Sequence, residues 1–441
     1  MKNYSFKNFL EKKTSIGIIG LGYVGLPLAC LLAKKFHVVG FDINEQRVKE
    51  LSKGFDRTEE VTKRDALLNP SLQYTSEAEE LKNCSLIIVT VPTPVDEFKK
   101  PDLRPLYSAS KRVAENMSKN TLIVYESTVY PGCTENECRE IIEKHSSFKF
   151  KEDFDLGYSP ERVNPGDKNH SIEKITKIIS ASSQDALLLL EQVYGTVIEA
   201  GLYRAPDIKT AEAAKVIENI QRDINIALIN ELALIFDRCG IDTEEVLNAA
   251  STKWNFLRFT PGLVGGHCIG VDPYYLTYMA EGLGLNSQLV LSGRRINDSM
   301  GPFVAEKAIK LVLNKNKSIK HPLKFAVLGL TFKENVPDLR NSKVIDVIKG
   351  LEDFGAEVYC SDPVCDPIEF EEIYKRKLTA WEDIPVCDAI ILAVKHKKII
   401  ETLSLYDLER KLNPEHKILL DLKSVYDRHL GQSLGIQIWR L

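Results

Sequence analysis

The sequence predicts an α/β protein with two Rossmann-like, doubly wound domains joined by a long central helix and a helical middle region. Three observations predict this fold class. A glycine-rich turn separates a strand pattern from a helix pattern near the start, the same order of strands returns late in the chain, and helical periodicity fills the stretch between them. A chain of 441 residues is long enough for two or three domains.

The first strand is expected at 14–20, where a short apolar run is typical of a buried parallel strand. A G-x-G-x-x-G pattern follows and leads into a helix. Gly20 permits the tight turn, Gly22 lets the backbone approach a pyrophosphate, and Gly25 lets helix and strand pack closely. The helix N-terminus then faces the phosphates, so this unit is predicted to bind a dinucleotide.

The second strand, at 37–42, ends on Asp42. A carboxylate at this place accepts a hydrogen bond from a ribose 2′-hydroxyl and repels a 2′-phosphate. The sequence therefore predicts NAD rather than NADP, although the nearby Arg47 weakens that preference.

Two further strands are expected at 85–91 and 121–125, and each is followed by a polar or proline-rich loop, 92–94 and 126–128. Ligands of open α/β sheets lie beyond the carboxyl ends of the strands. These two loops are therefore expected to border the nicotinamide, with ordinary strand-end turns as the alternative.

The second half repeats this order, with strands expected at 324–330, 356–362, 388–394 and 416–421 and a helix at 342–354. It lacks the glycine pattern, and its first loop, 331–341, is longer and contains Lys333 and Arg340. These cations suit a nucleotide with exposed phosphates rather than a second NAD.

The middle of the chain is expected to be helical. A helix of about 30 residues is predicted at 207–239, ended by Gly240, and a second helix is predicted at 242–250 after an Asp-x-x-Glu cap. The expected domains are 1–200, 201–310 and 311–441. The apolar helical middle is also the expected surface of a homodimer or higher homo-oligomer.

Polar side chains that could serve catalysis lie on the long helix and in one rigid loop. Glu212, Lys215 and Asn219 fall on one helical face, and a lysine and an amide four residues apart can both donate to an oxyanion. Glu161 follows Pro160 and could act as a general base. A solvated helix face and an ordinary salt bridge are the alternatives.

The segment 259–273 is the most unusual in the chain. Its glycines bend the backbone around Cys268, with His267 beside it and Asp272 four residues on. A thiol is strongly nucleophilic and can attack an aldehyde. An inert core cysteine is the alternative here, and it is the expectation for the other eight cysteines.

Composition excludes several classes of protein. A net charge of −4 argues against non-specific nucleic-acid binding, and no apolar run is long enough to span a membrane. The opening residues lack the apolar core of a signal peptide, so a cytoplasmic protein is expected. The nine scattered cysteines form no C-x-x-C pair and predict neither disulfides nor a metal site.

Seven motifs in order resemble the UDP-glucose/GDP-mannose dehydrogenase family over nearly the whole chain. They are Gly20-x-Gly-Tyr-Val-Gly-Leu-Pro, Val91-Pro-Thr-Pro, Glu126-Ser-Thr, Ser159-Pro-Glu-Arg, Ala211-Glu-Ala-Ala-Lys-x-x-Glu-Asn219, Gly265-Gly-His-Cys-Ile-Gly-Val-Asp-Pro and Phe332-Lys-x-Asn with Asp338-x-Arg-x-Ser342. The stretch from Thr252 through the Cys268 loop is most similar to bacterial UDP-N-acetylhexosamine 6-dehydrogenases of Vi-antigen and O-antigen synthesis.

The resemblance implies a four-electron oxidation at sugar C6 with two NAD⁺, giving a uronic acid. Cys268 would form a thiohemiacetal and then a thioester, and Lys215 and Asn219 would stabilise the oxyanion. Asp272 and Thr128 would position water or relay a proton, and Glu161 would assist hydrolysis.

The resemblance also implies the residues that bind cofactor and substrate. NAD would contact Gly20, Gly22, Tyr23, Val24, Gly25, Asp42, Arg47, Thr93, Thr128 and Arg340. The UDP-sugar would contact Glu161, Arg162, Lys215, Asn219, Phe256, Arg258, Gly262, Phe332 and Lys333.

The sequence departs from the family pattern at two places. Lys423 stands where many UDP-glucose enzymes carry an arginine, and His267 differs from the UDP-glucose members. UDP-GlcNAc or UDP-GalNAc is the expected substrate. The alternatives are UDP-glucose, UDP-ManNAc or GDP-mannose, a silent NAD-binding regulator, and a two-electron hydroxyacid dehydrogenase.

Overall fold

The computed structural model describes residues 4–162, 171–266, 268–315 and 322–441. The chain folds as two units, each with its own sheet and hydrophobic core. The first unit comprises Met1–Glu218 and Tyr274–Leu285, and the second comprises Asn219–Pro273 and Asn286–Leu441.

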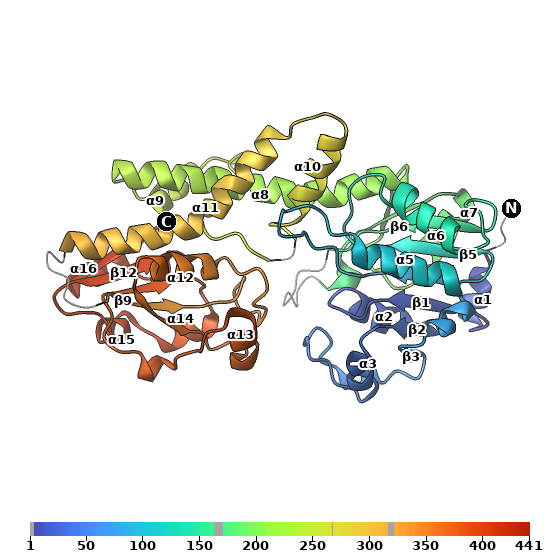
Figure 1. Cartoon of the computed structure of the whole chain (residues 1–441), viewed down its shortest axis with the longest axis horizontal. Coiled ribbons are helices and arrows are strands. Elements are labelled where there is room, and N and C mark those ends of the chain that lie inside the picture. Colours follow the sequence, from blue (N-terminus) through green and yellow to red (C-terminus); the bar gives the residue numbers. More distant parts are fainter. Residues whose placement is uncertain (1–3, 163–170, 267, 316–321) are drawn as a thin grey trace. The chain divides into compact units, whose positions relative to one another are not determined.

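The sheet of the first unit has eight strands in the order β3-β2-β1-β4-β5-β6-β7-β8 (Figure 1). The strands are β1 Ser15–Ile19, β2 Val38–Phe41, β3 Leu72–Thr75, β4 Cys84–Val89, β5 Thr121–Tyr125, β6 Phe154–Tyr158, β7 Lys177–Ala181 and β8 Leu202–Arg204. Within this order, all strands from β3 through β2, β1, β4 and β5 to β6 run parallel, and β7 pairs antiparallel with β6. The carboxyl ends of β1, β2, β4 and β5 therefore share one edge, which is where a dinucleotide binds in such a sheet.

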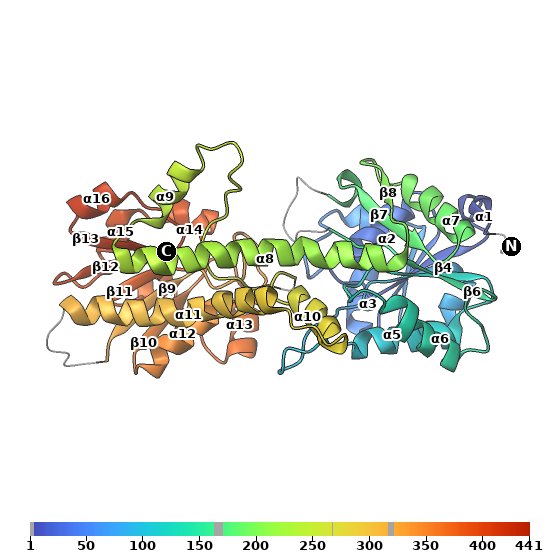
Figure 2. The same cartoon turned by 90° about the horizontal axis from the view of Figure 1, so that it is seen from above.

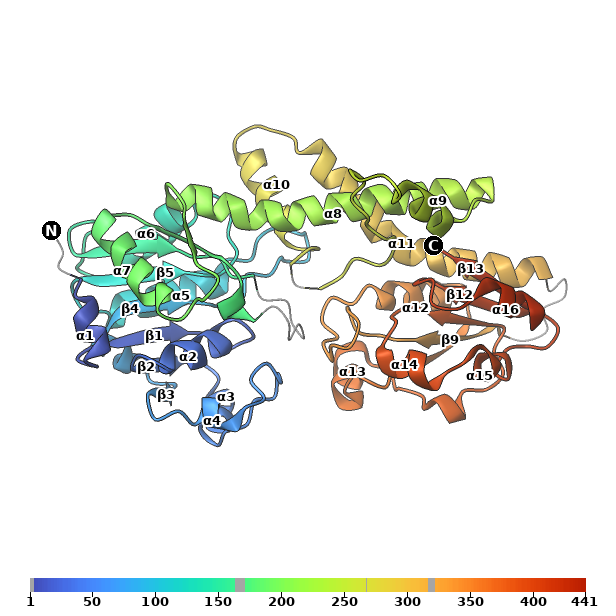
Figure 3. The same ribbon diagram turned by 180° about the vertical axis from the view of Figure 1, so that it is seen from behind.

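Helices cover both faces of this sheet. They are α1 Phe6–Leu10, α2 Gly25–Ala33, α3 Glu45–Ser52, α4 Arg64–Leu67, α5 Arg104–Asn116, α6 Arg139–His145 and α7 Gln184–Gly195. Helices α2 and α7 lie on one face and α5 and α6 on the other (Figures 1 and 3). The core on the α2 side includes Ile16 and Ile18 of β1 and Leu189 of α7, all buried, as alternating apolar residues in a strand require.

The sheet of the second unit is entirely parallel, in the order β10-β9-β11-β12-β13. The strands of the second unit are β9 Lys324–Leu328, β10 Glu357–Ser361, β11 Ala389–Leu392, β12 Lys417–Asp421 and β13 Ile436–Arg440. The helices of this unit include α9 Thr243–Ala250, α11 Gln288–Lys315, α12 Val344–Asp353, α13 Pro367–Tyr374, α14 Lys397–Thr402, α15 Leu405–Glu409 and α16 Arg428–Ser433. Figure 3 shows α14 and α15 in front of these strands.

Alternate residues of β9 pack into two different hydrophobic cores of the second unit. Phe325 and Val327 pack in the core that α11 and α12 supply, and Ala326 and Leu328 pack in the core that α14 and α15 supply. A parallel sheet buried on both faces in this way is doubly wound. The predicted fold class, with two Rossmann-like parts, is therefore confirmed.

The predicted long helix is also confirmed. Helix α8 spans Ile208–Cys239, is 32 residues long, and is continuous in Figure 2. It ends before Gly240, whose φ is +70°, and Asp242 caps α9 by accepting from the N–H groups of Glu244 and Glu245. Helix α10, Asp272–Gly282, follows the glycine-rich loop. The domain boundaries 1–200, 201–310 and 311–441 stay a prediction.

Helix α11 is 28 residues long and contains Pro302 in its interior; most of it falls in the middle region that was expected to be helical, but its bounds were not predicted. A glycine-proline step normally argues against a helix. Here Gly301 is required by packing, because a Cβ there would lie 2.7 Å from the Cβ of Asp346 on α12. Tertiary contact with α12 therefore overrides the local preference. Among the described residues, no helix is long and apolar enough to cross a membrane.

Candidate active site

The glycine-rich turn between β1 and α2 has the geometry of a dinucleotide-binding turn. Gly20 has φ +92°, and a Cβ on Gly25 would lie 1.9 Å from the Gly20 carbonyl oxygen, so both positions require glycine. A Cβ on Gly22 would have no atom within 4 Å. The packing of the described residues thus does not require glycine at position 22, and the open space there would let a ligand approach the backbone.

Thr90, which follows β4, also supports the turn and was not predicted from the sequence. Its hydroxyl lies 2.7 Å from the carbonyl oxygen of Gly20 and 3.0 Å from that of Ile19. The side chain therefore ties the end of β4 to the glycine-rich turn. A threonine after a strand has no distinctive sequence signal.

Two alanine substitutions separate ligand approach from packing. Gly22→Ala is expected to raise the Kd for NAD at least about tenfold and to leave the melting temperature unchanged, since the new methyl group meets only ligand. Gly25→Ala is expected to lower the free energy of unfolding by about 3 kcal/mol, since its methyl group overlaps the Gly20 carbonyl. Calorimetric titration with NAD and thermal unfolding check both; a destabilised Gly22→Ala variant would contradict this division.

The acid at the end of β2 closes the turn. Asp42 accepts from the backbone N–H of Leu21 at 2.8 Å and from that of Asn44 at 2.9 Å. This holds its carboxylate beside the turn, where a ribose hydroxyl can donate to it. The glycines, the start of α2 and Asp42 together fit an NAD molecule.

Arg47 is buried rather than directed into solvent. Its Nε donates to the carbonyl oxygen of Leu21 at 3.1 Å, and its Nη1 lies 2.7 Å from the Asp56 carboxylate. This guanidinium braces the turn and is balanced by a carboxylate. The predicted contact of Arg47 with NAD stays a prediction.

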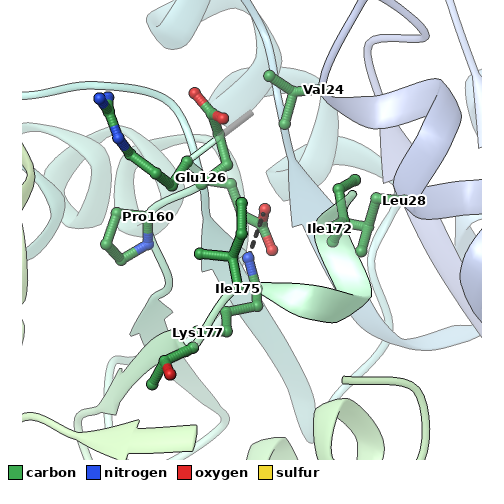
Figure 4. Close-up of a pocket in the computed structure, with 10 residues that line it drawn as sticks. Val24, Leu28, Glu126, Pro160, Ile172, Ile175 and Lys177 are labelled. Atoms are coloured by element: carbon green, nitrogen blue, oxygen red, sulfur yellow. Dashed lines mark hydrogen bonds and ion pairs between the residues drawn. The ribbon is translucent and has the colours of Figure 1, made fainter. Parts of the chain in front are cut away.

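A pocket lies beside the turn in the first unit (Figure 4). It is lined by Val24, Leu28, Glu126, Pro160, Glu161, Arg162, Ile172, Ile175, Thr176 and Lys177. Figure 4 shows Lys177 directed at Glu126, and the two form a buried ion pair at 3.0 Å. Burial raises the pKa of the Glu126 carboxyl, which the Lys177 ammonium and a hydrogen bond from Tyr194 only partly offset.

The predicted loop residues follow the ends of β4 and β5. Thr93 and Thr128 are half-buried in the loops after β4 and β5, and Tyr23 is half-buried on the turn. Tyr275 of α10 donates to the Pro94 carbonyl at 3.1 Å and so supports the first of these loops. The ordered loops lie at the strand ends where the sequence placed them.

Lys215 and Glu161 are brought together in the first unit. The Lys215 ammonium is 1% exposed and lies 2.8 Å from the Glu161 carbonyl oxygen and 3.2 Å from its carboxylate. Arg162 forms an ion pair with Glu218 at 3.4 Å. The face of α8 that carries Lys215 is therefore buried, which removes the alternative of a solvated face for this residue.

Glu212, one turn earlier on α8, has a different role. Its carboxylate accepts from the backbone N–H groups of Gly132 and Thr134, which follow Thr128 in the chain. Burial raises the pKa of Glu212 to about 7, and the hydrogen bonds from Thr134 and Gly132 only partly offset this. Glu212 thus anchors the segment that carries Thr128.

This burial predicts a pH dependence of stability. Between the ordinary pKa of 4.5 and about 7, folded Glu212 holds a proton that the unfolded chain has released. The free energy of unfolding therefore contains a part that is complete below pH 4.5 and is lost as the pH rises through about 7. Glu212→Gln cannot titrate, so its melting temperature is expected to fall less steeply than that of the wild type over this range. Parallel curves in thermal unfolding would contradict the assignment.

Cys268, Asp272 and Asn219 are brought together in the second unit. The backbone N–H of Asp272 donates to the Cys268 carbonyl at 2.8 Å, so the thiol-bearing turn leads directly into α10. The Asn219 amide lies 2.5 Å from the Asp272 carboxylate, and Arg222 donates to the Asn219 carbonyl oxygen at 2.9 Å. Asn219 and Asp272 are buried and Cys268 is half-buried.

The glycine-rich loop is also held by residues that the sequence analysis missed. The Asn230 side chain donates to the Gly262 carbonyl at 3.0 Å and accepts from the Gly262 N–H at 2.8 Å. Asn297 in turn accepts from the Asn230 amide at 2.8 Å. Two buried asparagines on long helices carry no sequence signal, because only the fold brings them to this loop.

A second pocket, in the second unit, includes several predicted substrate residues. Phe332 and Lys333 line it together with Gly265 and Lys423. A Cβ on Gly266 would lie 2.8 Å from the Phe332 ring, so this ring rests on the loop that precedes Cys268. Burial lowers the pKa of Lys423, whose Nζ is 3.9 Å from Glu334. Lys423, the position at which the sequence departs from the expected arginine of many UDP-glucose enzymes, thus lines this pocket.

The remaining predicted residues lie elsewhere. Arg258 folds onto α9, donating to Asn248 at 2.8 Å and pairing with Glu244, and Phe256 is half-buried in the same loop. Arg340 is exposed and forms a bidentate pair with Asp338. Their predicted ligand contacts stay predictions, and His267 lies outside the described residues.

Three comparisons with known proteins agree. The UDP-glucose/GDP-mannose dehydrogenase family matches the chain through its NAD binding domain at residues 14–198, its central domain at 209–299 and its UDP binding domain at 326–428. The predicted cofactor, NAD, is confirmed by the first of these matches.

Individual proteins are also similar. Protein CapL of Staphylococcus aureus is 48% identical over 97% of this chain and 99% of its own length. A UDP-N-acetyl-D-glucosamine 6-dehydrogenase of Salmonella typhi is 48% identical over 94% of this chain and 96% of its own length. The structure of a UDP-D-ManNAc dehydrogenase from Pyrococcus horikoshii superposes with a TM-score of 0.85 at 30% identity, covering 97% of this chain and 98% of that one.

Proposed function

Since the chain belongs to the UDP-glucose/GDP-mannose dehydrogenase family, we propose that it oxidises C6 of a UDP-N-acetylhexosamine to the carboxylate. The product is a uronic acid for surface polysaccharide synthesis. The observation that carries the choice of substrate is the 48% identity, over 94% of this chain, to a UDP-N-acetyl-D-glucosamine 6-dehydrogenase. UDP-GlcNAc and UDP-GalNAc are the substrates proposed.

The reaction proceeds in two oxidations and a hydrolysis. When bound, NAD⁺ supplies the hydride acceptor for both oxidations. The Cys268 thiol adds to the C6 aldehyde, forming a C–S bond while the carbonyl oxygen takes up a proton, and loss of the C6 hydride and the hydroxyl proton from this thiohemiacetal gives a thioester. Water then adds to the thioester, the C–S bond breaks, and the acid leaves with the thiol restored.

Lys215 and Asn219 act as donors to the oxygen that becomes negative in these steps. Each such donor contributes about 3 kcal/mol of transition-state stabilisation. The pairing of Asn219 with Asp272 supports this role, because a carboxylate orients the amide. Asp272 and Thr128 position the water, and Glu161, held against Lys215, assists hydrolysis.

The nucleotide part of the substrate binds to the second unit. The pocket with Phe332, Lys333 and Lys423 supports this assignment, since an aromatic ring can stack on a base and two ammonium groups can meet phosphates. Arg162, Phe256, Arg258 and Gly262 complete the proposed substrate contacts, and Arg340 the contacts to NAD.

We also propose a cytoplasmic homodimer or higher homo-oligomer that associates through α8. Large apolar side chains of this helix are more than half exposed in the single chain, namely Ile217 at 56% and Leu228 at 52%. Exposed apolar residues on one long helix are typical of an interface. Light scattering in solution tests it; a monomeric mass would contradict the proposal.

UDP-N-acetylmannosamine is the second candidate substrate, favoured by the likeness to the Pyrococcus horikoshii structure. The expected result of a panel of UDP-GlcNAc, UDP-GalNAc, UDP-ManNAc, UDP-glucose and GDP-mannose is the highest kcat/KM with one of the first two. NADH absorbance measures the rates. Preference for UDP-ManNAc or UDP-glucose would keep the chemistry and overturn the substrate.

A further inference from the structure

One buried imidazole holds the loop after β9 at both of its ends. His396 follows β11 and is fully buried. The backbone N–H of Asn335 donates to its Nδ1 at 2.9 Å, and its Nε2 lies 3.1 Å from the hydroxyl of Thr331 and 3.0 Å from the Asp362 carboxylate. Residues 331–335, hereafter the 331–335 loop, are therefore bracketed by a single side chain.

The hydrogen bonds determine which tautomer this histidine adopts. Because Nδ1 accepts from the Asn335 N–H, it carries a lone pair and no proton. The Thr331 hydroxyl donates its proton to the Lys333 carbonyl at 2.8 Å, so toward His396 it can only accept. Both neighbours thus require a neutral ring with the proton on Nε2, which is shared between Thr331 and Asp362.

Asp362 keeps the ring in this orientation. Its carboxylate accepts from the Leu330 N–H at 2.6 Å and from the Val364 N–H at 2.7 Å. The same pattern occurs at Asp42, which accepts from the Leu21 N–H at 2.8 Å in the first unit. In the second unit the carboxylate of the corresponding acid, Asp362, also contacts His396, and this pair supports a loop.

The loop has a conformation that needs such support. Asn335 has a φ of +61°, in the left-handed region that residues other than glycine rarely adopt. The oxygen of its side-chain amide accepts from the Lys397 N–H at 2.8 Å. Between the two held ends lie Phe332 and Lys333, which line the second pocket. The Phe332 ring in turn rests on Gly266, two residues before Cys268.

We infer that His396, as the neutral Nε2–H tautomer oriented by Asp362, is a positioning residue that holds the 331–335 loop for binding of the substrate's nucleoside diphosphate. This inference rests on the proposed function, in which Phe332 and Lys333 contact that group. The imidazole touches no substrate; it fixes the ends of the segment that does.

The second unit contains a matched control. His416 precedes β12 and its Nε2 lies 3.1 Å from the carboxylate of Asp388, which precedes β11, and both side chains are buried. This second histidine–aspartate pair thus lies at the amino ends of the strands, the opposite edge of the sheet from His396. Substitution of His416 therefore measures how much the loss of a buried histidine–aspartate pair changes the affinity for UDP when the contacts of the 331–335 loop are left intact.

The test is calorimetric titration of UDP and of NAD into the full chain, with KM and kcat for the UDP-sugar. His396→Gln keeps a donor toward Asp362 but removes the acceptor at Nδ1, and it is expected to raise the Kd for UDP and the KM at least about tenfold. His396→Asn places an oxygen near the Nδ1 position but loses the Nε2 donor, so it is expected to raise the Kd for UDP about threefold, less than His396→Gln does. The Kd for NAD is expected to stay within about twofold in both.

UDP affinity of His396→Gln equal to that of the wild type, or an equal loss in His416→Gln, would overturn the inference. If His396→Gln does not fold, Thr331→Val, which removes only the hydroxyl between Nε2 and the Lys333 carbonyl, replaces it with an expected loss of at least about threefold; unchanged UDP binding there would equally overturn it. A wild-type chain that binds no UDP would instead overturn the proposed function, and the inference with it.

Discussion

Replacing Cys268 with alanine is expected to abolish formation of the uronic acid while the Kd for NAD stays within about twofold. The thiol is the protein group that forms a covalent bond to C6 in the proposed reaction, and loss of a nucleophile typically lowers kcat by about 10³-fold or more. The residues proposed to bind NAD on the glycine-rich turn and at Asp42 belong to the first unit, and Cys268 belongs to the second. Mass spectrometry of the product and titration with NAD measure the two effects.

Cys239 offers the matched control for this substitution. It is an exposed thiol at the end of α8, with no role in the proposed reaction. Cys239→Ala is expected to make the acid at the wild-type rate. Acid production by Cys268→Ala at a rate near that of the control would exclude the thioester route.

Replacing Lys215 with methionine is expected to have two separate effects. The first is a fall in kcat of about 10²-fold, because an oxyanion donor is lost. The second is a loss of about 3 kcal/mol or more in the free energy of unfolding, because the Glu161 carboxylate, 3.2 Å from the ammonium and 8% exposed, loses its charge partner. Rapid kinetics and denaturant unfolding measure them independently.

A double substitution separates these effects. In Lys215→Met combined with Glu161→Gln, no charge is left buried without its partner, so much of the lost stability is expected to return. The turnover is expected to stay low, since neither change restores the donor. Recovery of kcat together with stability would mean that Lys215 acts only by maintaining the fold.

Local pattern was sufficient to predict the fold wherever one signal dominated. The glycine pattern fixed the first βαβ unit, because steric exclusion at Gly25 leaves no other residue possible. Apolar periodicity was enough for α8, whose predicted range of 207–239 differs from the observed Ile208–Cys239 by one residue. The bounds of α11 were not predicted within the helical middle region; Pro302 opposes a helix locally, and packing against α12 outweighs it.

Prediction of the site was limited by long-range contacts. Lys215 and Glu161 were each predicted to be catalytic, for separate reasons. Their ion pair could not be predicted from the sequence, since 54 residues separate them. Thr90, Asn230 and His396 were missed for the same reason: each supports a loop that is distant in the chain. Residues that carry the chemistry have distinctive neighbours in sequence, and residues that hold them in place do not.

The central claim is a four-electron oxidation through a cysteine thioester, and NADH formed per mole of UDP-GlcNAc consumed tests it most directly. Two NADH are expected for each sugar, with the uronic acid as the product. One NADH for each sugar, with an aldehyde or ketone as the product, would contradict it, because a two-electron dehydrogenase needs no nucleophilic thiol.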